Sequence, residues 1–192
     1  NVHLINLKES PIKKISPNSL DADKNYPIDT LILATGFDAI TGALTNIDIT
    51  GRGNIKLKDQ WEMGAKSYLG IGISNFPNLF TITGPGSPSV LSNMMPSIEQ
   101  HVNWISNCID WMIKNNKSVI ESSATAEEEW MTLVNEIADM TIFTDTKSWY
   151  NGSNIEEKAK AFLPFIGVPV YTEMIEDVVS ENYKGFIFDR VN

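Results

Sequence analysis

The sequence predicts an α/β protein, and three patterns indicate this class. Two apolar runs, at residues 29–35 and 79–83, each stop at Thr-Gly. A strand that is buried on both faces has a continuous apolar sequence of this kind. Two long stretches with apolar residues at helical spacing follow the second run, one ending at about Asn115 and one opening at Thr125. This order favours parallel strand ends followed by long helices.

Composition limits the classes of partner. The chain has 192 residues, of which 42% are hydrophobic, which is enough for a sizeable core. Its net charge of −9 argues against nucleic acid and anionic membrane surfaces as partners. With a single cysteine, Cys108, and two histidines, a zinc site is implausible, so we expect no metal. The same cysteine usage suits a reducing compartment, and we expect a cytoplasmic location.

The first 36 residues are expected to form strands. Residues 2–7 alternate between apolar and polar types and predict one strand, and residues 11–15 predict a shorter one. Turn-rich sequence at 16–25 indicates a meander of exposed strands. Residues 29–35 are then expected to form a buried strand, whose terminal glycine would let a ligand or another backbone approach.

The middle of the chain predicts loops and then a helix. Between residues 42 and 72, glycines separate short apolar pieces, which indicates loops and short strands. Residues 79–83 are expected to form a second buried strand, followed by a turn at 84–88 and the long helix. Cys108 in this helix is interpreted as a small buried hydrophobe. Five positions at helical spacing predict the buried face of the helix: Ile98, Val102, Ile105, Ile109 and Met112.

The last third predicts two more helices and a closing strand. Thr125 with Glu128 is typical of a capping box at the start of the second helix. Residues 148–160 predict a loop and residues 162–166 a strand. Thr172 is expected to cap the last helix, and residues 186–188 to form the final strand.

The connection between residues 79–83 and the long helix is the best site that the residues themselves indicate. A helix N-terminus offers free N–H groups and partial positive charge. Such an end would stabilise an electron-rich ring carbonyl, for example the pyrimidine edge of a flavin. An ordinary strand–turn–helix connection is the alternative, and the residues leave both open. Gly70-Ile71-Gly72 and Gly84-Pro85-Gly86 are not dinucleotide fingerprints, because each lacks the third glycine of G-x-G-x-x-G.

Aromatic residues and histidines add little by themselves. Four tryptophans are interpreted as packing residues: Trp61, Trp104, Trp111 and Trp130. Trp149 lies in the predicted loop, where it would either close over a flat cofactor or pin the loop to the surface. His101 is interpreted as a residue satisfied by solvent or by a hydrogen bond.

Five motifs occur in order along the chain. They are Asp29-x-Leu31-Ile32-x-Ala34-Thr35-Gly36-Phe37-Asp38-Ala39, Phe76-Pro77-Asn78-Leu79-Phe80, Gly84-Pro85-x-Ser87-Pro88-Ser89-x-Leu91-Ser92-Asn93-Met94, Ser97-Ile98-Glu99-Gln100-x-Val102-x-Trp104-Ile105 and Ser148-Trp149-Tyr150-x-Gly152-x-Asn154-Ile155. Together they resemble the C-terminal portion of Baeyer–Villiger monooxygenases of the cyclohexanone and phenylacetone type. The first motif alone is shared with other flavin monooxygenases, whereas the combination is specific.

The resemblance implies a partial flavoprotein with two dinucleotide-binding domains. Residues 1–36 would be the last strands of the NADP-binding domain and the linker. Residues 37–192 would be the C-terminal part of the FAD-binding domain, with helical and closing-loop segments. The phosphate-binding fingerprints and the catalytic arginine of the family would lie upstream of Asn1. The missing N-terminal part is therefore an expected partner, no catalytic residue is assigned here, and we expect the chain alone to be inactive.

The resemblance also implies which residues bind cofactor and substrate. It assigns five residues to FAD and NADP(H): Met94 against the flavin with Asn93 beside it, Thr35 and Gly36 near the nicotinamide nucleotide, and Trp149 folding over NADP. It assigns three to the loop that lines the substrate pocket: Ser89, Val90 and Leu91.

The implied reaction uses NADPH and O2 to convert a ketone into an ester or lactone through a flavin peroxide. Two alternatives remain. One is a related flavin monooxygenase that oxygenates nitrogen or sulfur, and the other is a non-catalytic remnant that acts as an interaction domain.

Overall fold

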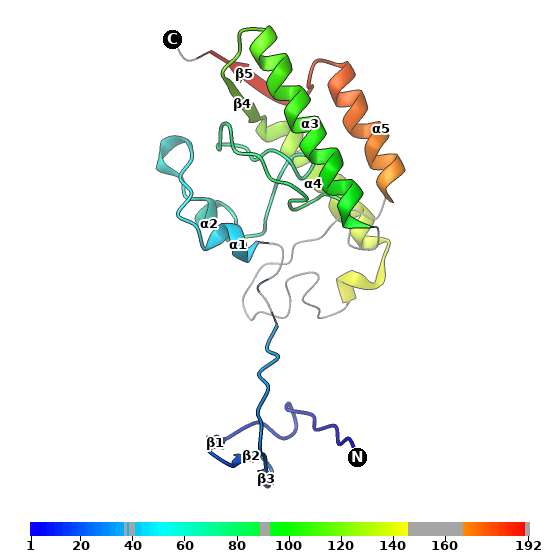
Figure 1. Cartoon of the computed structure of the whole chain (residues 1–192). Helices are drawn as coiled ribbons and strands as arrows, with labels where there is room; N and C mark the ends of the chain where they lie inside the picture. The colour runs from blue at the N-terminus through cyan, green and yellow to red at the C-terminus, as the bar shows by residue number, and fades with distance from the viewer. Residues whose placement is uncertain (37, 39–40, 89–92, 146–166, 191–192) are drawn as a thin grey trace. The chain divides into compact units, whose positions relative to one another are not determined.

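The computed structural model describes residues 1–36, 38, 41–88, 93–145 and 167–190 (Figure 1). It divides into two compact units, Asn1–Gly36 and Phe37–Asn192. This division lies where the sequence places a domain boundary. The assignment of the two units to an NADP-binding and an FAD-binding domain stays a prediction.

The first unit is a small antiparallel meander. It consists of β1 (Lys14–Ser16), β2 (Ser19–Asp21) and β3 (Asn25–Pro27), in that order in the sheet. Ile15 pairs with Leu20, and Leu20 pairs with Tyr26. The predicted meander of exposed strands is therefore confirmed.

Two strands predicted in the first unit are wrong. Residues 2–7 and 29–35 are not strands, and their apolar side chains are exposed, with Ile32 at 83% and Leu33 at 69%. A strand forms where a partner accepts and donates the backbone hydrogen bonds. No strand within the described residues pairs with either run, so the apolar sequence alone does not impose the strand.

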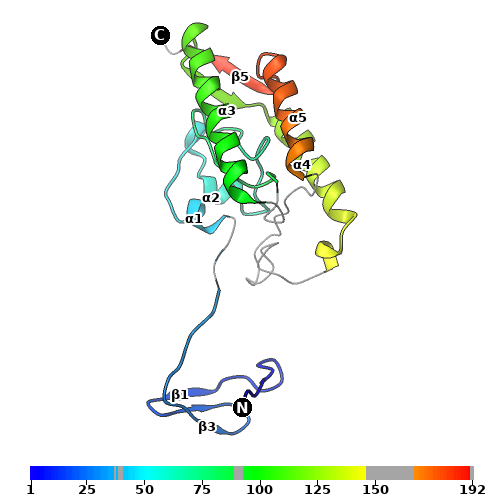
Figure 2. The ribbon, with the colours of Figure 1, turned by 45° about the vertical axis from the view of Figure 1, so that its right-hand side comes forward.

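The second unit holds three long helices and a strand pair. The long helices are α3 (Met94–Lys114), α4 (Ala124–Asp139) and α5 (Gly167–Ser180), and β4 (Val119–Ser122) pairs antiparallel with β5 (Phe186–Asp189). Shorter elements are α1 (Gly42–Thr45), η1 (Arg52–Asn54), α2 (Leu57–Gln60) and η2 (Ile142–Asp145). Helices α3 and α5 run side by side in Figures 1 and 2. The mixed content confirms the α/β class, and β5 confirms the predicted final strand.

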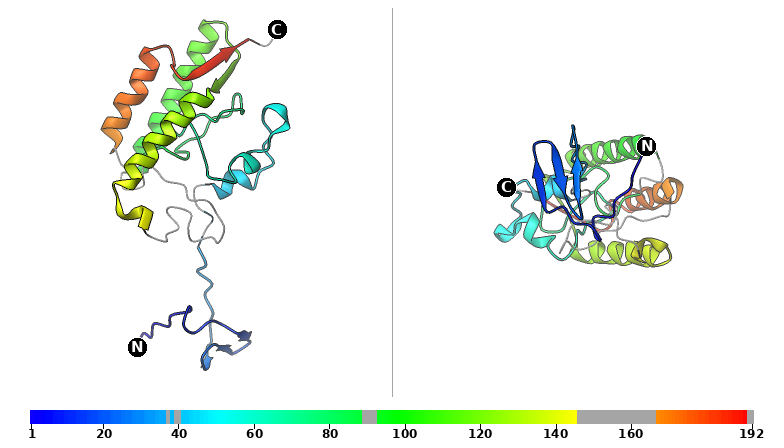
Figure 3. Two further views of the ribbon diagram at one scale, coloured as in Figure 1. Left: turned by 180° about the vertical axis from the view of Figure 1, so that it is seen from behind. Right: turned by 90° about the horizontal axis from the view of Figure 1, so that it is seen from below.

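One core joins the three long helices, β4 and an irregular loop at residues 67–72. Figure 3 shows the ribbon of these helices from behind and from below. Trp104 of α3 packs edge-on against Tyr183, with ring centroids 5.1 Å apart, and Trp130 of α4 packs against Tyr68. A smaller core contains Leu57 and Trp61. The four tryptophans predicted to pack do so, with Trp111 partly buried.

Residues 79–83 are not the predicted strand. Phe80 makes one isolated bridge with Gly72, and Ile82 is 47% exposed. Positive φ angles at Asn75, Asn78 and Thr83 turn the chain at both ends of the run. Because these turns leave too few extended residues, the apolar run packs as a loop.

The buried face of α3 differs from the predicted one. Val102 is 43% exposed and Ile109 is 42% exposed. The buried stripe consists of Ser97, His101, Trp104, Cys108 and Met112. The large indole of Trp104 buries more apolar area than an aliphatic side chain, which rotates the helix toward it. Cys108 is fully buried, as predicted, and burial raises the pKa of its thiol to about 12.

Both predicted caps are wrong. Ser123 caps α4, because its hydroxyl accepts the N–H of Ala126 at 3.1 Å, and Thr125 lies inside the helix. Thr172 lies inside α5, where its hydroxyl donates to the carbonyl of Val168. Ser123 is as good a cap as threonine and stands two residues earlier.

Two other predictions, the loop at 148–160 and the strand at 162–166, lie outside the described residues. Among the helices that the structure describes, none combines the length and apolar character needed to cross a membrane.

Candidate functional site

The N-terminus of α3 is the predicted site, and its first turn leaves a donor available. The side chain of Asn93 caps the helix by accepting the N–H of Met95 at 3.1 Å. Pro96 has no N–H. The N–H of Met94 is therefore a donor that no described residue accepts from. The first turn carries no acidic residue, so the positive end of this 21-residue helix is not neutralised from within.

The turn that leads to this helix is buried rather than exposed. Residues 84–88 are all buried. The N–H of Gly84 donates to the carbonyl of Gly70 at 3.1 Å, and the hydroxyl of Thr81 donates to the same oxygen at 2.8 Å. These bonds attach the turn to the loop at residues 67–72.

The carbonyl groups of the turn are also held by side chains. The hydroxyl of Ser67 donates to the carbonyl of Pro85 at 2.5 Å and accepts the N–H of Gly70. The indole of Trp130 donates to the carbonyl of Gly86 at 3.1 Å. The loop at residues 67–72 and helix α4 therefore both hold the turn through hydrogen bonds.

Glycine is required where the turn meets the loop. A Cβ on Gly84 would lie 2.4 Å from the hydroxyl of Thr81 and 2.8 Å from the carbonyl of Gly70. A Cβ on Gly70 would lie 2.5 Å from Cβ of Ser87, and Gly70 has a φ of +73°. These close approaches show why Gly84 and Gly70 are glycines, although neither belongs to a dinucleotide fingerprint.

A buried histidine–tyrosine pair contacts the residue that precedes the turn. The N–H of Thr83 donates to Nδ1 of His101 at 3.0 Å, and Nε2 of His101 lies 2.7 Å from the hydroxyl of Tyr171. The hydroxyl of Tyr171 donates to the carbonyl of Leu69 at 2.5 Å. Burial lowers the pKa of His101 to about 4 and raises the pKa of Tyr171. His101 is thus satisfied by hydrogen bonds, which was one of its two interpretations.

Two buried hydroxyls flank residues 89–92. Ser87 and Ser97 are 1% and 0% exposed, and their Oγ atoms have no hydrogen-bond partner among the described residues. Buried hydroxyls are normally bonded. We call the turn at residues 84–88 together with the start of α3 the junction. Its Ser87 and Ser97 hydroxyls are each without a hydrogen-bond partner among the described residues.

The predicted site residues are described to different extents. Asn93 and Met94 lie at the start of α3. Thr35 and Gly36 lie at the end of the first unit, where both are exposed and Gly36 has a φ of +87°. Four residues lie outside the described ranges: Ser89, Val90, Leu91 and Trp149.

Sequence reasoning missed the residues that hold the turn. His101 stands three residues before Trp104 and seven before Cys108, so its helical spacing was a usable indication of burial. Ser67, Trp130 and Tyr171 are distant in sequence from residues 83–88. No local pattern could have associated them with the turn.

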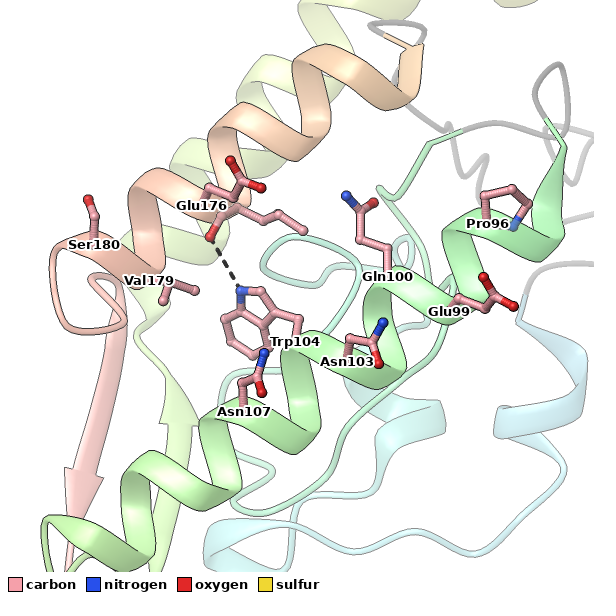
Figure 4. Close-up of a pocket in the computed structure, with 10 residues that line it drawn as sticks. Pro96, Glu99, Gln100, Asn103, Trp104, Asn107, Glu176, Val179 and Ser180 are labelled. Carbon is pink, nitrogen blue, oxygen red and sulfur yellow. Dashed lines mark hydrogen bonds between the residues drawn. The ribbon is translucent and has the colours of Figure 1, made fainter.

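A groove between α3 and α5 is a separate feature (Figure 4). It has a volume of about 580 Å3 and contains none of the predicted site residues. Glu99 of α3 and Glu176 of α5 line it, and these carboxylates disfavour the phosphates of a dinucleotide. The groove is therefore not the cofactor site that the sequence predicts.

The chemistry of this helix start follows from its available N–H and its cap. An N–H held at the positive end of a helix stabilises negative charge that develops beside it. The arrangement suits the carbonyl edge of a flat, electron-rich ring better than it suits a general acid or base. Neither Asn93 nor Met94 transfers protons.

The chain is similar to known monooxygenases over nearly its whole length. No protein-family model matches it. It is 36% identical to cyclohexanone 1,2-monooxygenase from Acinetobacter sp, a match that covers 97% of this chain and 34% of that protein. It is 37% identical to a Baeyer-Villiger monooxygenase from Pseudooceanicola batsensis, covering 99% of this chain and 35% of that protein. It is also 37% identical to phenazine N-monooxygenase PhzNO1 from Lysobacter antibioticus, covering 97% and 35%.

Solved structures give the same result. Cyclohexanone monooxygenase from Rhodococcus sp. Phi1 bound to NADP+ has a TM-score of 0.91 at 34% identity, covering 97% of this chain and 35% of that chain. OTEMO in complex with FAD and NADP has a TM-score of 0.90 at 33% identity, covering 98% and 35%. The chain thus spans about a third of the length of the curated relatives it matches.

Proposed function

The chain is a relative of the flavin-dependent Baeyer–Villiger monooxygenases, and on this premise we propose that the protein containing it uses NADPH and O2 to convert a ketone into an ester or lactone. The chain spans about a third of these relatives, so the proposed activity is that of the whole protein. The single observation that carries the proposal is the capped N-terminus of α3 with its available N–H, which suits the carbonyl edge of a flavin.

In this proposal Met94 and Asn93 hold the flavin of FAD. The N–H of Met94 would donate to the carbonyl edge of the ring, and Asn93 would keep the first turn in place through its bond to Met95. Bound FAD would supply the redox chemistry, taking reducing equivalents from NADPH and delivering them to O2. The available N–H, the absence of acid in the first turn and the unused hydroxyls of Ser87 and Ser97 fit such a ring.

The two units would serve two cofactors. We assign the first unit to the end of the NADP-binding domain and the second to the FAD-binding domain. The division of the chain after Gly36 supports this assignment, because Thr35 and Gly36 are then the last residues of the first unit. A Cβ on Gly36 would meet nothing within 4 Å, so a nucleotide could approach its backbone closely. Trp149 is proposed to cover NADP.

The proposed substrate pocket includes Ser89, Val90 and Leu91. These residues connect the buried end of the turn, at Pro88, to the capping residue Asn93. Met94, which is proposed to bind the flavin edge, stands three positions after Leu91 in the sequence. This short separation supports a substrate pocket close to the proposed flavin site. The free thiol of Cys108 agrees with a cytoplasmic location, which we include in the proposal.

Product analysis tests the function. The natural protein that contains this chain would be incubated with NADPH, a cyclic ketone and 18O2. We expect one labelled oxygen in a lactone, formed in proportion to NADPH consumed. A flavoprotein that consumes NADPH and leaves every ketone of a cyclic and linear panel unchanged would overturn the proposal.

A second candidate is oxygenation of nitrogen, which the similarity to the phenazine N-monooxygenase favours. The same assay with a phenazine in place of the ketone separates the two reactions, because an N-oxide retains the ring carbon skeleton. Purified protein that contains no flavin and consumes no NADPH would instead support a non-catalytic interaction domain.

A further inference from the structure

Three contacts join α3 to α5 along one side of each helix. The amide of Gln100 donates to the hydroxyl of Thr172 at 2.6 Å. The indole of Trp104 donates to the carbonyl of Ile175 at 3.3 Å, the bond drawn dashed in Figure 4. The third contact is that of His101 with Tyr171. It is the only one of the three whose two residues are both completely buried, at 0% exposure each.

The contact of His101 with Tyr171 continues at both ends into residues with unusual backbones. Thr83, which donates to His101, has a φ of +51°, and Leu69, which accepts from Tyr171, has a φ of +61°. Neither residue is glycine, and the left-handed region is costly for branched and bulky side chains. Such conformations persist where the surroundings hold them. His101 and Tyr171 supply one hydrogen bond to each strained residue.

The order of donors in this chain of bonds is fixed. Because Thr83 donates its N–H, Nδ1 of His101 must accept, and the proton of the neutral ring lies on Nε2. Nε2 then donates to Tyr171, whose hydroxyl donates to Leu69. Loss of the tyrosine hydroxyl therefore removes the bond to the histidine and leaves the Leu69 carbonyl without its described donor.

We propose that His101 and Tyr171 are positioning residues for the flavin-binding junction. They hold Leu69 and Thr83 in strained conformations and so fix the turn at residues 83–88, and with it the start of α3, against α5. The inference rests on the proposed function, because it takes flavin as the group that the junction receives. It adds that the geometry at Met94 depends on a tyrosine in α5, 77 positions further along the chain.

Tyr68 provides a matched control for Tyr171. It is a buried tyrosine of the same core, 9% exposed, whose hydroxyl donates to the carbonyl of Lys184 at 3.1 Å. That hydroxyl makes no described bond to the turn or to His101. Tyr68→Phe and Tyr171→Phe therefore remove the same group from the same core, and only the second removes it from the strained pair.

Hydrogen exchange is the first test, and it requires no cofactor. In the natural protein, we expect Tyr171→Phe to speed exchange of the Thr83 amide roughly fivefold, the effect of about one net hydrogen bond. Tyr68→Phe should leave this amide unchanged. His101→Asn, which keeps an acceptor for Thr83 but cannot reach Tyr171, should resemble Tyr171→Phe. Equal exchange in the two tyrosine variants would overturn the proposal.

The flavin provides the second test. We expect both tyrosine variants to lower the melting temperature similarly, while only Tyr171→Phe shifts the visible spectrum of bound flavin and at least doubles the NADPH consumed per product. Identical spectra and coupling in both variants would reduce Tyr171 to a packing residue. If the wild-type protein binds no flavin, the proposed function is refuted. The exchange experiment needs no flavin, so it still tests the positioning role of Tyr171 separately.

Discussion

Two segments of this chain share a sequence pattern and differ in everything around it. Each is an apolar run that ends at Thr-Gly, at Thr35-Gly36 and at Thr83-Gly84. At the first, Ile32 and Leu33 are exposed, and a Cβ on Gly36 would meet nothing within 4 Å. At the second, the glycine is buried and the turn after it is bound by a loop, a helix and a histidine.

The difference shows what the pattern specifies. Thr-Gly marks a place where the chain stops being extended, because glycine permits conformations and approaches that other residues do not. It does not specify what surrounds that place. Packing from distant residues decides whether the end becomes a rigid junction, and four experiments test this contrast.

The largest expected effect is at Ile71, in the loop at residues 67–72 that binds the turn after Thr83-Gly84. Ile71 is 0% exposed, and its carbonyl accepts the N–H of Thr81. Ile71→Ala should lower the free energy of unfolding by about 4 kcal/mol, because it leaves a cavity in the core. Ile32→Ala, in the exposed run, should change it by less than about 0.5 kcal/mol. Urea unfolding followed by tryptophan fluorescence measures both, and equal losses would remove the contrast.

The next effect is a pH dependence from His101. Its pKa in the folded chain is about 4, below its ordinary 6.5, so the folded state favours the neutral ring. This preference contributes about 3 kcal/mol to the free energy of unfolding. The contribution is fully present above pH 6.5 and is lost as the pH falls through about 4. His101→Gln should unfold more easily at pH 7 and show a flatter slope between these pH values. A slope as steep as the wild type would contradict the assignment.

Glycine substitution compares the two ends directly. Gly84→Ala should cost about 2 kcal/mol, because its Cβ would overlap the Gly70 carbonyl. Gly36→Ala should cost about 1 kcal/mol, because only its φ of +87° opposes a side chain. The measurement is the unfolding of each unit, by fluorescence for the second and by circular dichroism for the first. A larger loss at Gly36 would reverse the comparison.

The smallest effect is a gain. Thr83→Asn should raise the free energy of unfolding by about 0.5 kcal/mol, because asparagine tolerates the left-handed region better than threonine. The bond from its N–H to His101 is retained. Thermal unfolding of this variant beside Thr83→Val, which keeps the branched Cβ, isolates the backbone contribution. A loss in the asparagine variant would show that Thr83 is not strained.

The helices could be predicted from the sequence because their information is local. Apolar residues at helical spacing gave α3 to within a few residues, and the terminal strand β5 was also predicted. The buried face of α3 was not, because the choice between Val102 and Trp104 depends on Tyr183 and Phe186, far along the chain. The run at 29–35 failed as a strand for a related reason, since strands need partners.

The candidate site shows the same division. A helix start after a glycine-rich turn was predictable, and the cap at Asn93 agrees with it. The bonds that hold the turn come from residues between 14 and 44 positions away, from Gly70 on Gly84 to Trp130 on Gly86. Tyr171 acts on the turn only through His101 and Leu69. Such contacts leave no spacing pattern in a single sequence. The roles of Met94, Thr35 and Trp149 remain predictions.

The reactivity of the buried Cys108 can be used to measure unfolding of the second unit. Its thiol is fully buried in the core that joins the three long helices, and its pKa of about 12 leaves almost no thiolate at neutral pH. As the sole cysteine of the chain, it reacts with a thiol reagent when that core opens. The labelling rate of Cys108 therefore reports the opening equilibrium of the second unit, with no engineered dye.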